Sequence, residues 1–254
     1  MKISQMSPAF AVFTVLFLLI SGCSGTVVKD SPAPAGSPLK AKPIQGENST
    51  LTTQPAQPAT VNIKLPEPRL KSSVSLEEAL YSRRSIRQYA DSPLTLSDVS
   101  QLLWAAQGIT DSTGKRTAPS AQRLYPLEVY IVAGNVENLT PGIYLYSPEG
   151  HELVKIKDGD FRSELGGRPD SQKAPIDIVM VGNYSKVPEK FGTEGAKWVH
   201  LECGHAAQNI CLQATALNLG TVTAAGFQED KLKSLLGLSA GKGILYLMPV
   251  GKKT

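Results

Sequence analysis

The sequence predicts an α+β fold in which a β-sheet is sandwiched by helices. Short apolar runs of strand length are mixed with helical segments, and no repeated βαβ unit joins them. One proline-free segment over residues 194–219 is the longest predicted helix. The residues from 69 onward number about 185, which is ample for one hydrophobic core.

The N-terminal 68 residues are expected to lie outside this domain. Residues 1–23 combine Lys2, an apolar run over residues 10–20 and small residues ahead of Cys23, which resembles a lipoprotein signal that leaves Cys23 lipid-modified. An ordinary signal peptide or a short anchor helix would explain the same run. Residues 24–68 contain no aromatic residue and eight of the 18 prolines, so we expect a disordered tether. The protein would then be exported and lipid-anchored to the cell membrane or an outer membrane, with residues 69–254 folded.

Capping residues mark the starts of two helices. Ser75-Leu76-Glu77-Glu78 is a capping box with Ser75 as the N-cap, and the helix is expected to end near Ser82. Thr95 begins a second helix, with Asp98 in place of the usual Glu, that is expected to end at Gly108. Gly220 is the expected left-handed terminator of the long helix. The other predicted elements are a helix over residues 229–236 and strands over residues 127–133, 142–146, 152–156, 176–182, 221–225 and 243–250.

Charge, cysteine and histidine patterns exclude several functions. The net charge is only +4, and no basic stripe with interleaved aromatic residues indicates nucleic acid binding. Cys203 and Cys211 are eight residues apart in one predicted helix, about 12 Å by helix rise, which is too far for a disulfide. His200 and His205 are five apart and would not share a helix face, so we predict no metal site.

Arginine is crowded into residues 82–89, directly after the first predicted helix. Three arginines and two serines within eight residues are hard to explain as part of a core. Arginine offers a rigid fork of donors that suits phosphate and carbonyl oxygens. The segment therefore predicts a site for a ligand with a dianionic phosphate and several carbonyl acceptors.

Four segments occur in order along the chain. They are Arg83-Arg84-Ser85-Ile86-Arg87; Pro119-Ser120-Ala121-Gln122 within residues 117–126; Glu202-Cys203-Gly204-His205 running on through Gln208-Asn209 to Gly220 and Ala225-Gly226; and Met248-Pro249-Val250-Gly251-Lys252. Together they resemble the nitroreductase superfamily of FMN-dependent oxidoreductases, and most closely its SagB-type (azoline dehydrogenase-like) branch. The resemblance covers roughly residues 75–252 and implies a nitroreductase-like sheet sandwiched by helices in an interlocked homodimer.

The resemblance implies which residues bind FMN. Arg83, Arg84 and Ser85 would hold the phosphate and ribityl chain, and Arg87 would approach the N1/C2 edge, where a cation stabilises the charge gained on reduction. The other residues that it implies are Pro119, Ser120 and Gln122 in a loop that the partner subunit lays over the flavin, Ala225 and Gly226 beside flavin N5, and Lys252 at the phosphate. Gln122 stands where many relatives carry Gly or Asn. From the residues alone, Arg84 could be a surface charge, the loop a proline-fixed turn, and Lys252 part of a solvated tail.

The long helix is implied to form the dimer interface, with His205, Gln208 and Asn209 making hydrogen bonds across it. Hydride would pass from a donor such as NAD(P)H through flavin N5 to a nitroaromatic, a quinone or a similar acceptor, and no side chain is assigned a catalytic role. Two alternatives stay open: a non-catalytic module that binds flavin or a peptide, and a dehydrogenase of a peptide-derived azoline ring. Relatives that oxidise azolines carry a Lys-Tyr pair where this chain has Lys190-Phe191, and phenylalanine has no hydroxyl.

Overall fold

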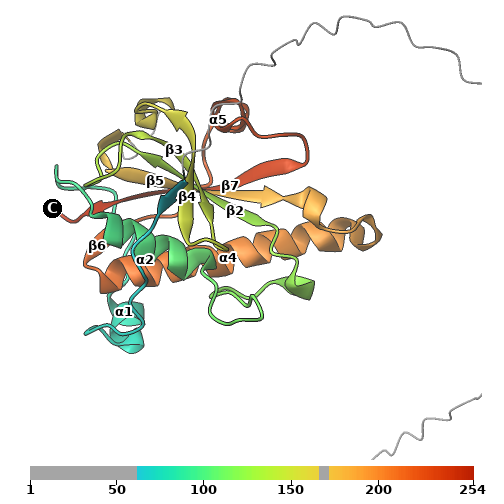
Figure 1. Ribbon diagram of the computed structural model, residues 1–254, viewed down its shortest axis with the longest axis horizontal. Helices are drawn as coiled ribbons and strands as arrows, with labels where there is room; N and C mark the ends of the chain where they lie inside the picture. Colours follow the sequence, from blue (N-terminus) through green and yellow to red (C-terminus); the bar gives the residue numbers. More distant parts are fainter. Residues whose placement is uncertain (1–61, 166–171) are drawn as a thin grey trace, which may run out of the picture. The chain divides into compact units, whose positions relative to one another are not determined.

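An antiparallel β-sheet organises the part of the chain that the computed structural model describes, residues 62–165 and 172–254 (Figure 1). Its strand order is β1-β4-β3-β2-β5-β7-β6, and every hydrogen-bonded pair is antiparallel. The strands are β1 (Asn62–Lys64), β2 (Leu127–Ala133), β3 (Gly142–Ser147), β4 (Glu152–Asp158), β5 (Ile176–Asn183), β6 (Leu219–Thr221) and β7 (Lys242–Lys252).

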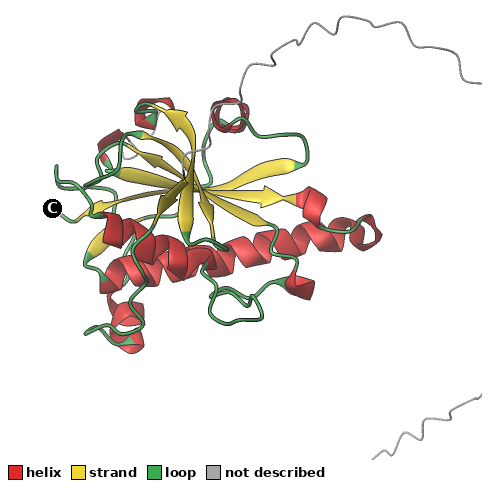
Figure 2. Ribbon diagram, in the orientation of Figure 1, coloured by secondary structure: helices red, strands yellow, loops and turns green. Residues whose placement is uncertain are grey.

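Helices cover both faces of this sheet (Figure 2). One hydrophobic core joins β2, β5 and β7 to α2 (Leu96–Gln107) and α4 (Gly192–Ala216). A second core joins the opposite face to α5 (Glu229–Leu236). A further α-helix, α1 (Leu76–Ser82), packs against α4. The prediction of an α+β sheet sandwiched by helices is confirmed.

Alternation along β5 shows why its sequence is apolar throughout. Ile176, Ile178 and Met180 point into the core beneath α2 and α4, whereas Val179 and Val181 point into the core beneath α5. Because both faces are covered, every residue of β5 except its last is buried. A strand covered on both faces needs such a near-continuous apolar run.

The helix caps form largely as the sequence predicts. The Ser75 hydroxyl accepts a hydrogen bond from the Glu78 backbone N–H at 3.1 Å. Thr95 and Asp98 form a complete, reciprocal capping box, because each side chain accepts from the other residue's backbone N–H. The helix that they start ends at the Gly108 C-cap, as expected.

Three sequence predictions are wrong at the ends of elements. Residues 62–64 form β1 and pair with β4, so the region assigned to the tether extends too far toward the C-terminus. The last helical residue of α4 is Ala216, and Asn218 rather than Gly220 takes the left-handed conformation, with φ of 58°. Gly220 instead lies within β6, which replaces the strand predicted over residues 221–225.

The predicted signal and most of the tether, including Cys23, lie outside the described residues. Among the helices that the structure does describe, none has the length and apolar character needed to cross a membrane.

Candidate functional site

The arginine segment, residues 83–87, follows α1 and is fixed to the edge of the sheet. The Ile86 backbone N–H donates to the Thr221 carbonyl oxygen at 3.0 Å, and the neighbouring Ser85 forms a β-bridge with Thr221. A Cβ atom on Gly220 would lie 2.6 Å from Ile86 Cγ2, so this close approach requires glycine. The hydroxyl of the buried Tyr89 donates to the Ile86 carbonyl oxygen at 2.8 Å. The backbone of the segment is therefore held against β6.

The three guanidinium groups differ in their surroundings. Arg84 is exposed, and its Nη1 donates to the carbonyl oxygens of Tyr81 and Arg83 at 2.9 and 2.8 Å. Arg83 is half-buried and lies near enough to Cys211 for its charge to oppose the rise in that thiol's pKa caused by burial. Arg87 is exposed and has no hydrogen-bond or ion-pair partner within residues 62–165 and 172–254.

An open cavity of about 380 Å³ adjoins this segment. Its lining includes Lys253, which sequence reasoning did not single out, whereas the predicted phosphate ligand Lys252 does not line it. The Lys253 ammonium also donates to the Asn218 side-chain oxygen at 3.3 Å. The residues that line the cavity are Ser85, Ile86, Arg87, Gln88, Lys253 and Thr254.

Ala225 and Gly226 lie between β6 and α5. The preceding Ala224 exchanges two backbone hydrogen bonds of 2.9 Å with Leu247 in β7, which anchors this connection to the sheet. Both Ala225 and Gly226 are exposed, and a Cβ atom on Gly226 would have no heavy atom within 4 Å. The backbone here is open to a planar ligand.

The 117–126 loop carries the predicted Pro119, Ser120 and Gln122. It contains the short 3₁₀ turn η1 (Ala121–Arg123), and Gln122, Arg123 and Tyr125 have positive φ values of 54°, 57° and 44°. Such backbone costs on the order of 1 kcal/mol or more for each residue other than glycine. The positive φ of Gln122 also explains why glycine or asparagine would suit this position. The loop must therefore be stabilised by its surroundings.

A buried carboxylate lies beneath this loop. Glu202 in α4 is only 2% exposed, and burial raises its pKa, although hydrogen bonds from Ser120 and Gln107, the charge of Arg116 and a hydrogen bond from the Leu127 backbone N–H lower it. The Gln107 side-chain Nε2 donates to Glu202 Oε1 at 3.3 Å. Glu202 stands three residues after Val199, on the apolar face of α4. A charged residue at such a position is a signal that sequence reasoning missed.

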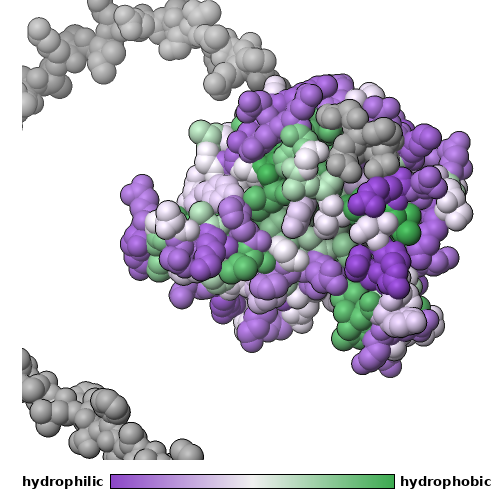
Figure 3. Space-filling model, turned by 180° about the vertical axis from the view of Figure 1, so that it is seen from behind, coloured by the Kyte–Doolittle hydropathy of each residue, from purple (hydrophilic) through white to green (hydrophobic). Residues whose placement is uncertain are grey.

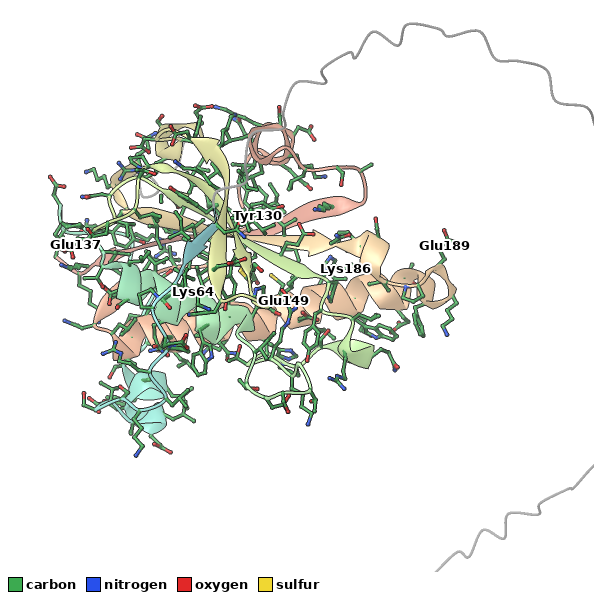
Figure 4. The ribbon with its side chains drawn as sticks, viewed as in Figure 1. Lys64, Tyr130, Glu137, Glu149, Lys186 and Glu189 are labelled. Carbon is green, nitrogen blue, oxygen red and sulfur yellow. The ribbon has the colours of Figure 1, made fainter. Side chains whose placement is uncertain are left out.

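A polar chain links this carboxylate to the surface. Arg116 donates to Gln107 Oε1 at 3.0 Å and to Glu149 Oε1 at 2.9 Å, and its guanidinium carbon lies 4.4 Å from the centre of the Tyr125 ring. Arg116 lines a cavity of about 210 Å³ together with Glu149 and Lys186, which are labelled in Figure 4.

The predicted interface residues lie on the outer side of α4, with one exception. His205 and Gln208 are exposed. Asn209 is half-buried, and its side-chain amide donates to the Thr117 carbonyl oxygen at 3.3 Å, so it ties α4 to the 117–126 loop within the same chain.

The structure brings the predicted site residues together in two separate groups. The arginine segment meets the ends of β6 and β7, whereas the 117–126 loop packs on α4. Within one chain, no hydrogen bond or ion pair joins the two groups among the described residues. Cys203 and Cys211 are free and buried, and the described residues contain no group of three His, Cys, Asp or Glu side chains that could hold a metal ion.

With this fold and site, the chain belongs to the nitroreductase family, whose model matches residues 80–252. A candidate nitroreductase of Methanocaldococcus jannaschii, MJ1384, is 40% identical over 198 residues, which cover 76% of this chain and 98% of that protein. The crystal structure of a candidate nitroreductase from Ralstonia eutropha JMP134 is 30% identical, with a TM-score of 0.69 over 76% of this chain and 90% of that one. The trifolitoxin operon protein TfxC of Rhizobium leguminosarum is 23% identical over 73% of this chain and 57% of its own length.

Proposed function

We propose that this protein is an FMN-dependent oxidoreductase that works as a homodimer with two flavin sites. The observation that carries the proposal is the arginine segment, which the backbone of β6 fixes at the rim of an open cavity that Lys253 also lines. Family membership supports the same cofactor. The acceptor would be a nitroaromatic, a quinone or a similar small molecule, and the donor would be NAD(P)H or another hydride source.

The residues present fit FMN in two respects. The Arg87 guanidinium has no partner in the described part of the chain, as expected of a group that awaits an anionic or carbonyl ligand. Thr221 Oγ1, at the bridge to Ser85, is buried without a hydrogen-bond partner among the described residues. An unpaired buried hydroxyl is costly and points to a missing partner.

Each group of residues has a distinct task in this proposal. Arg83, Arg84 and Ser85 would bind the phosphate and ribityl chain, and Arg87 would favour the negative charge that reduction brings. The open backbone at Gly226 would border the ring. When bound, FMN supplies a two-electron carrier between donor and acceptor.

Homodimer formation is part of the proposal because part of the outer face of α4 is left uncovered by residues 62–165 and 172–254. Leu201 is 53% exposed, and a Cβ atom on Gly204 would have no heavy atom within 4 Å. In α1, Leu76, Leu80 and Tyr81 are 61%, 53% and 82% exposed, and hydrophobic residues reach the surface at the lower right of Figure 3, where α1 projects. By the family resemblance, the second chain would contribute its 117–126 loop to the flavin site of the first.

Flavin binding by the full chain tests the proposal directly. We expect a yellow protein after FMN addition, and at least tenfold weaker FMN affinity for Arg83→Ala and for Arg87→Ala, because a hydrogen bond to a charged group contributes about 1.5–3 kcal/mol. Lys231→Ala, an exposed cation in α5, is the matched control. A wild-type protein that takes up no flavin would reject the proposal.

Two other functions, a non-catalytic binding module and an azoline dehydrogenase, would give different results when the same flavin-bound protein is mixed with donors. Anaerobic mixing with NADH and NADPH should bleach the bound flavin; flavin that stays oxidised with both would favour a non-catalytic binding module or another donor. The second of these functions, which the resemblance to the SagB-type branch implies, is oxidation of an azoline ring in a peptide. Against that reaction, Phe191 packs on Trp198 with ring centroids 4.6 Å apart and offers no hydroxyl. Bleaching by a thiazoline-containing peptide, but not by NAD(P)H, would favour it.

We propose further that residues 1–23 are a lipoprotein signal and that Cys23 anchors the exported protein to a membrane, with the following residues as tether. The wild type should partition into the membrane fraction, and Cys23→Ala should not. A Cys23→Ala protein that remains lipid-modified and membrane-bound would contradict the assignment.

A further inference from the structure

Glu202 has an unusual position for a charged residue, because it is buried within α4 and faces inward. Only 2% of it is exposed, and the hydrogen bonds and charges that reach it come from α2, the 117–126 loop and the start of β2. A buried carboxylate is costly unless several donors compensate it. Here the Gln107 amide donates at 3.3 Å, and the Ser120 hydroxyl and the Leu127 backbone N–H lie near enough to favour the charged form and lower the pKa of Glu202.

Two of these donors lie at the two ends of the strained part of the 117–126 loop. Ser120 directly precedes η1, and Leu127 begins β2 just after Tyr125. The Ser120 hydroxyl also accepts from the Tyr125 backbone N–H at 2.9 Å. The carboxylate thus lies near both the entry and the exit of the turn that contains the three residues with positive φ.

The same bonds limit what Ser120 can offer a ligand. A hydroxyl has one proton to donate and two lone pairs. The Tyr125 N–H occupies one lone pair of Ser120, and an ionised Glu202 can only accept the Ser120 proton. With both partners in place, Ser120 would keep one acceptor position, whereas the adjacent Pro119 is exposed.

Gln107 and Arg116 fix the direction of the network. Because Arg116 donates to Gln107 Oε1, the Gln107 Nε2 is turned toward Glu202. Arg116 also lies over the Tyr125 ring, so the same cation contacts the exit of the loop. Glu149, labelled in Figure 4, holds the outer end of Arg116.

We infer that Glu202 is a positioning residue that holds the 117–126 loop in the conformation that covers the flavin, and that it acts through Ser120 and the Leu127 backbone. This inference rests on the proposed function for the role of the loop, but not for the anchoring itself. Ser120 would then shape the loop, and the loop backbone around Pro119 would make the contact with the cofactor.

Loop mobility and cofactor affinity, measured in the same full-length variants, test this inference. In Glu202→Ala, we expect amide hydrogen exchange of residues 120–127 to become at least tenfold faster, and FMN affinity to fall about tenfold. Glu202→Gln retains a carbonyl acceptor without the charge and should fall between the wild type and Glu202→Ala. Glu194→Gln, on an exposed part of the same helix, is the matched control.

A double variant separates positioning from general stability. If Glu202 acts through Ser120, Ser120→Ala and Glu202→Ala together should weaken FMN binding no more than Glu202→Ala alone. Additive losses would overturn the inference, as would loop exchange and FMN affinity that stay within twofold of the control while only the melting temperature falls. If the wild type binds no FMN, both the proposed function and the cofactor role of Glu202 are rejected. Amide hydrogen exchange of the loop would still show whether Glu202 anchors it.

Discussion

Burial and hydrogen bonding act on the Glu202 carboxylate in opposite directions, and burial prevails. The pKa of Glu202 is raised above the usual range by desolvation, even though hydrogen bonds from Ser120 and Gln107, the charge of Arg116 and the Leu127 N–H lower it. Burial raises the pKa of the neighbouring Cys203 thiol to about 12, and the charge of Glu202 adds to that rise. Between the usual and the raised pKa, the folded protein binds more protons than the unfolded chain. The free energy of unfolding must therefore fall as pH rises through that window.

Glu202→Gln removes this titration and should change the pH dependence of stability. We expect the free energy of unfolding of the wild type, minus that of the variant, to decrease as pH rises above the ordinary glutamate pKa of about 4.3 and through the raised pKa of Glu202, because only the wild type carries the ionisable group. Urea unfolding at several pH values measures this difference. A difference that stays constant or grows with pH would contradict the raised pKa, and Glu194→Gln again serves as the control.

At the level of single residues, the sequence shows which residue types are unusual more clearly than it shows which residues contact one another. The arginines were recognisable because no core would need so many. The motif that contains Glu202 does not reveal its role, because the groups that surround it, Gln107, Ser120 and Leu127, are distant in sequence. Lys253 was missed for Lys252 because alternation along the last strand decides which of two neighbouring lysines lines the cavity.

Among the elements, those with local signals were predictable and those that depend on pairing were not. The helix Glu229–Leu236 and the strand Leu127–Ala133 have the bounds that periodicity indicated. Asn62–Lys64 is too short to carry a pattern, and it is a strand only because β4 pairs with it. The residue with left-handed backbone after α4 is Asn218, whereas Gly220 lies where Ile86 packs closely against it.

That packing contact gives a test at the scale of elements. Gly220→Ala places a Cβ atom 2.6 Å from Ile86 Cγ2, so either β6 or the arginine segment must shift. We expect a loss of about 1–3 kcal/mol in the free energy of unfolding, as for other overpacked sites, together with weaker FMN binding. Denaturant unfolding and FMN titration measure the two effects.

Shortening the opposing side chain controls for the substitution itself. Ile86→Ala removes the clashing carbons, so the Gly220→Ala/Ile86→Ala protein should lose less stability than the sum of the two single variants. A strictly additive result would show that Gly220 is needed for some reason other than the approach of Ile86.

For the whole molecule, the proposed flavin site would need a second chain to bring its two groups of residues together. The arginine segment and the 117–126 loop make no hydrogen bond to each other within the described residues, and the outer face of α4 exposes Leu201. One sequence could predict both groups of residues through the family resemblance. The sequence alone could not show that the arginine segment and the 117–126 loop lie apart within one chain, because this depends on how the elements that carry them pack.

Leu201→Glu tests the role of this face. Within one chain, Leu201 is 53% exposed, so a charge there should change the stability of the monomer by less than about 1 kcal/mol. In a dimer interface, the same charge would be buried without a partner, and we expect light scattering to show the mass of one chain instead of two, with FMN lost in parallel. Ile156→Glu, at a side chain 45% exposed in β4, is the matched control and should remain a flavin-bound dimer. If the Leu201→Glu protein stays dimeric, the exposed face of α4 is not the dimer interface; if a wild-type monomer holds FMN fully, the flavin site is completed within a single chain.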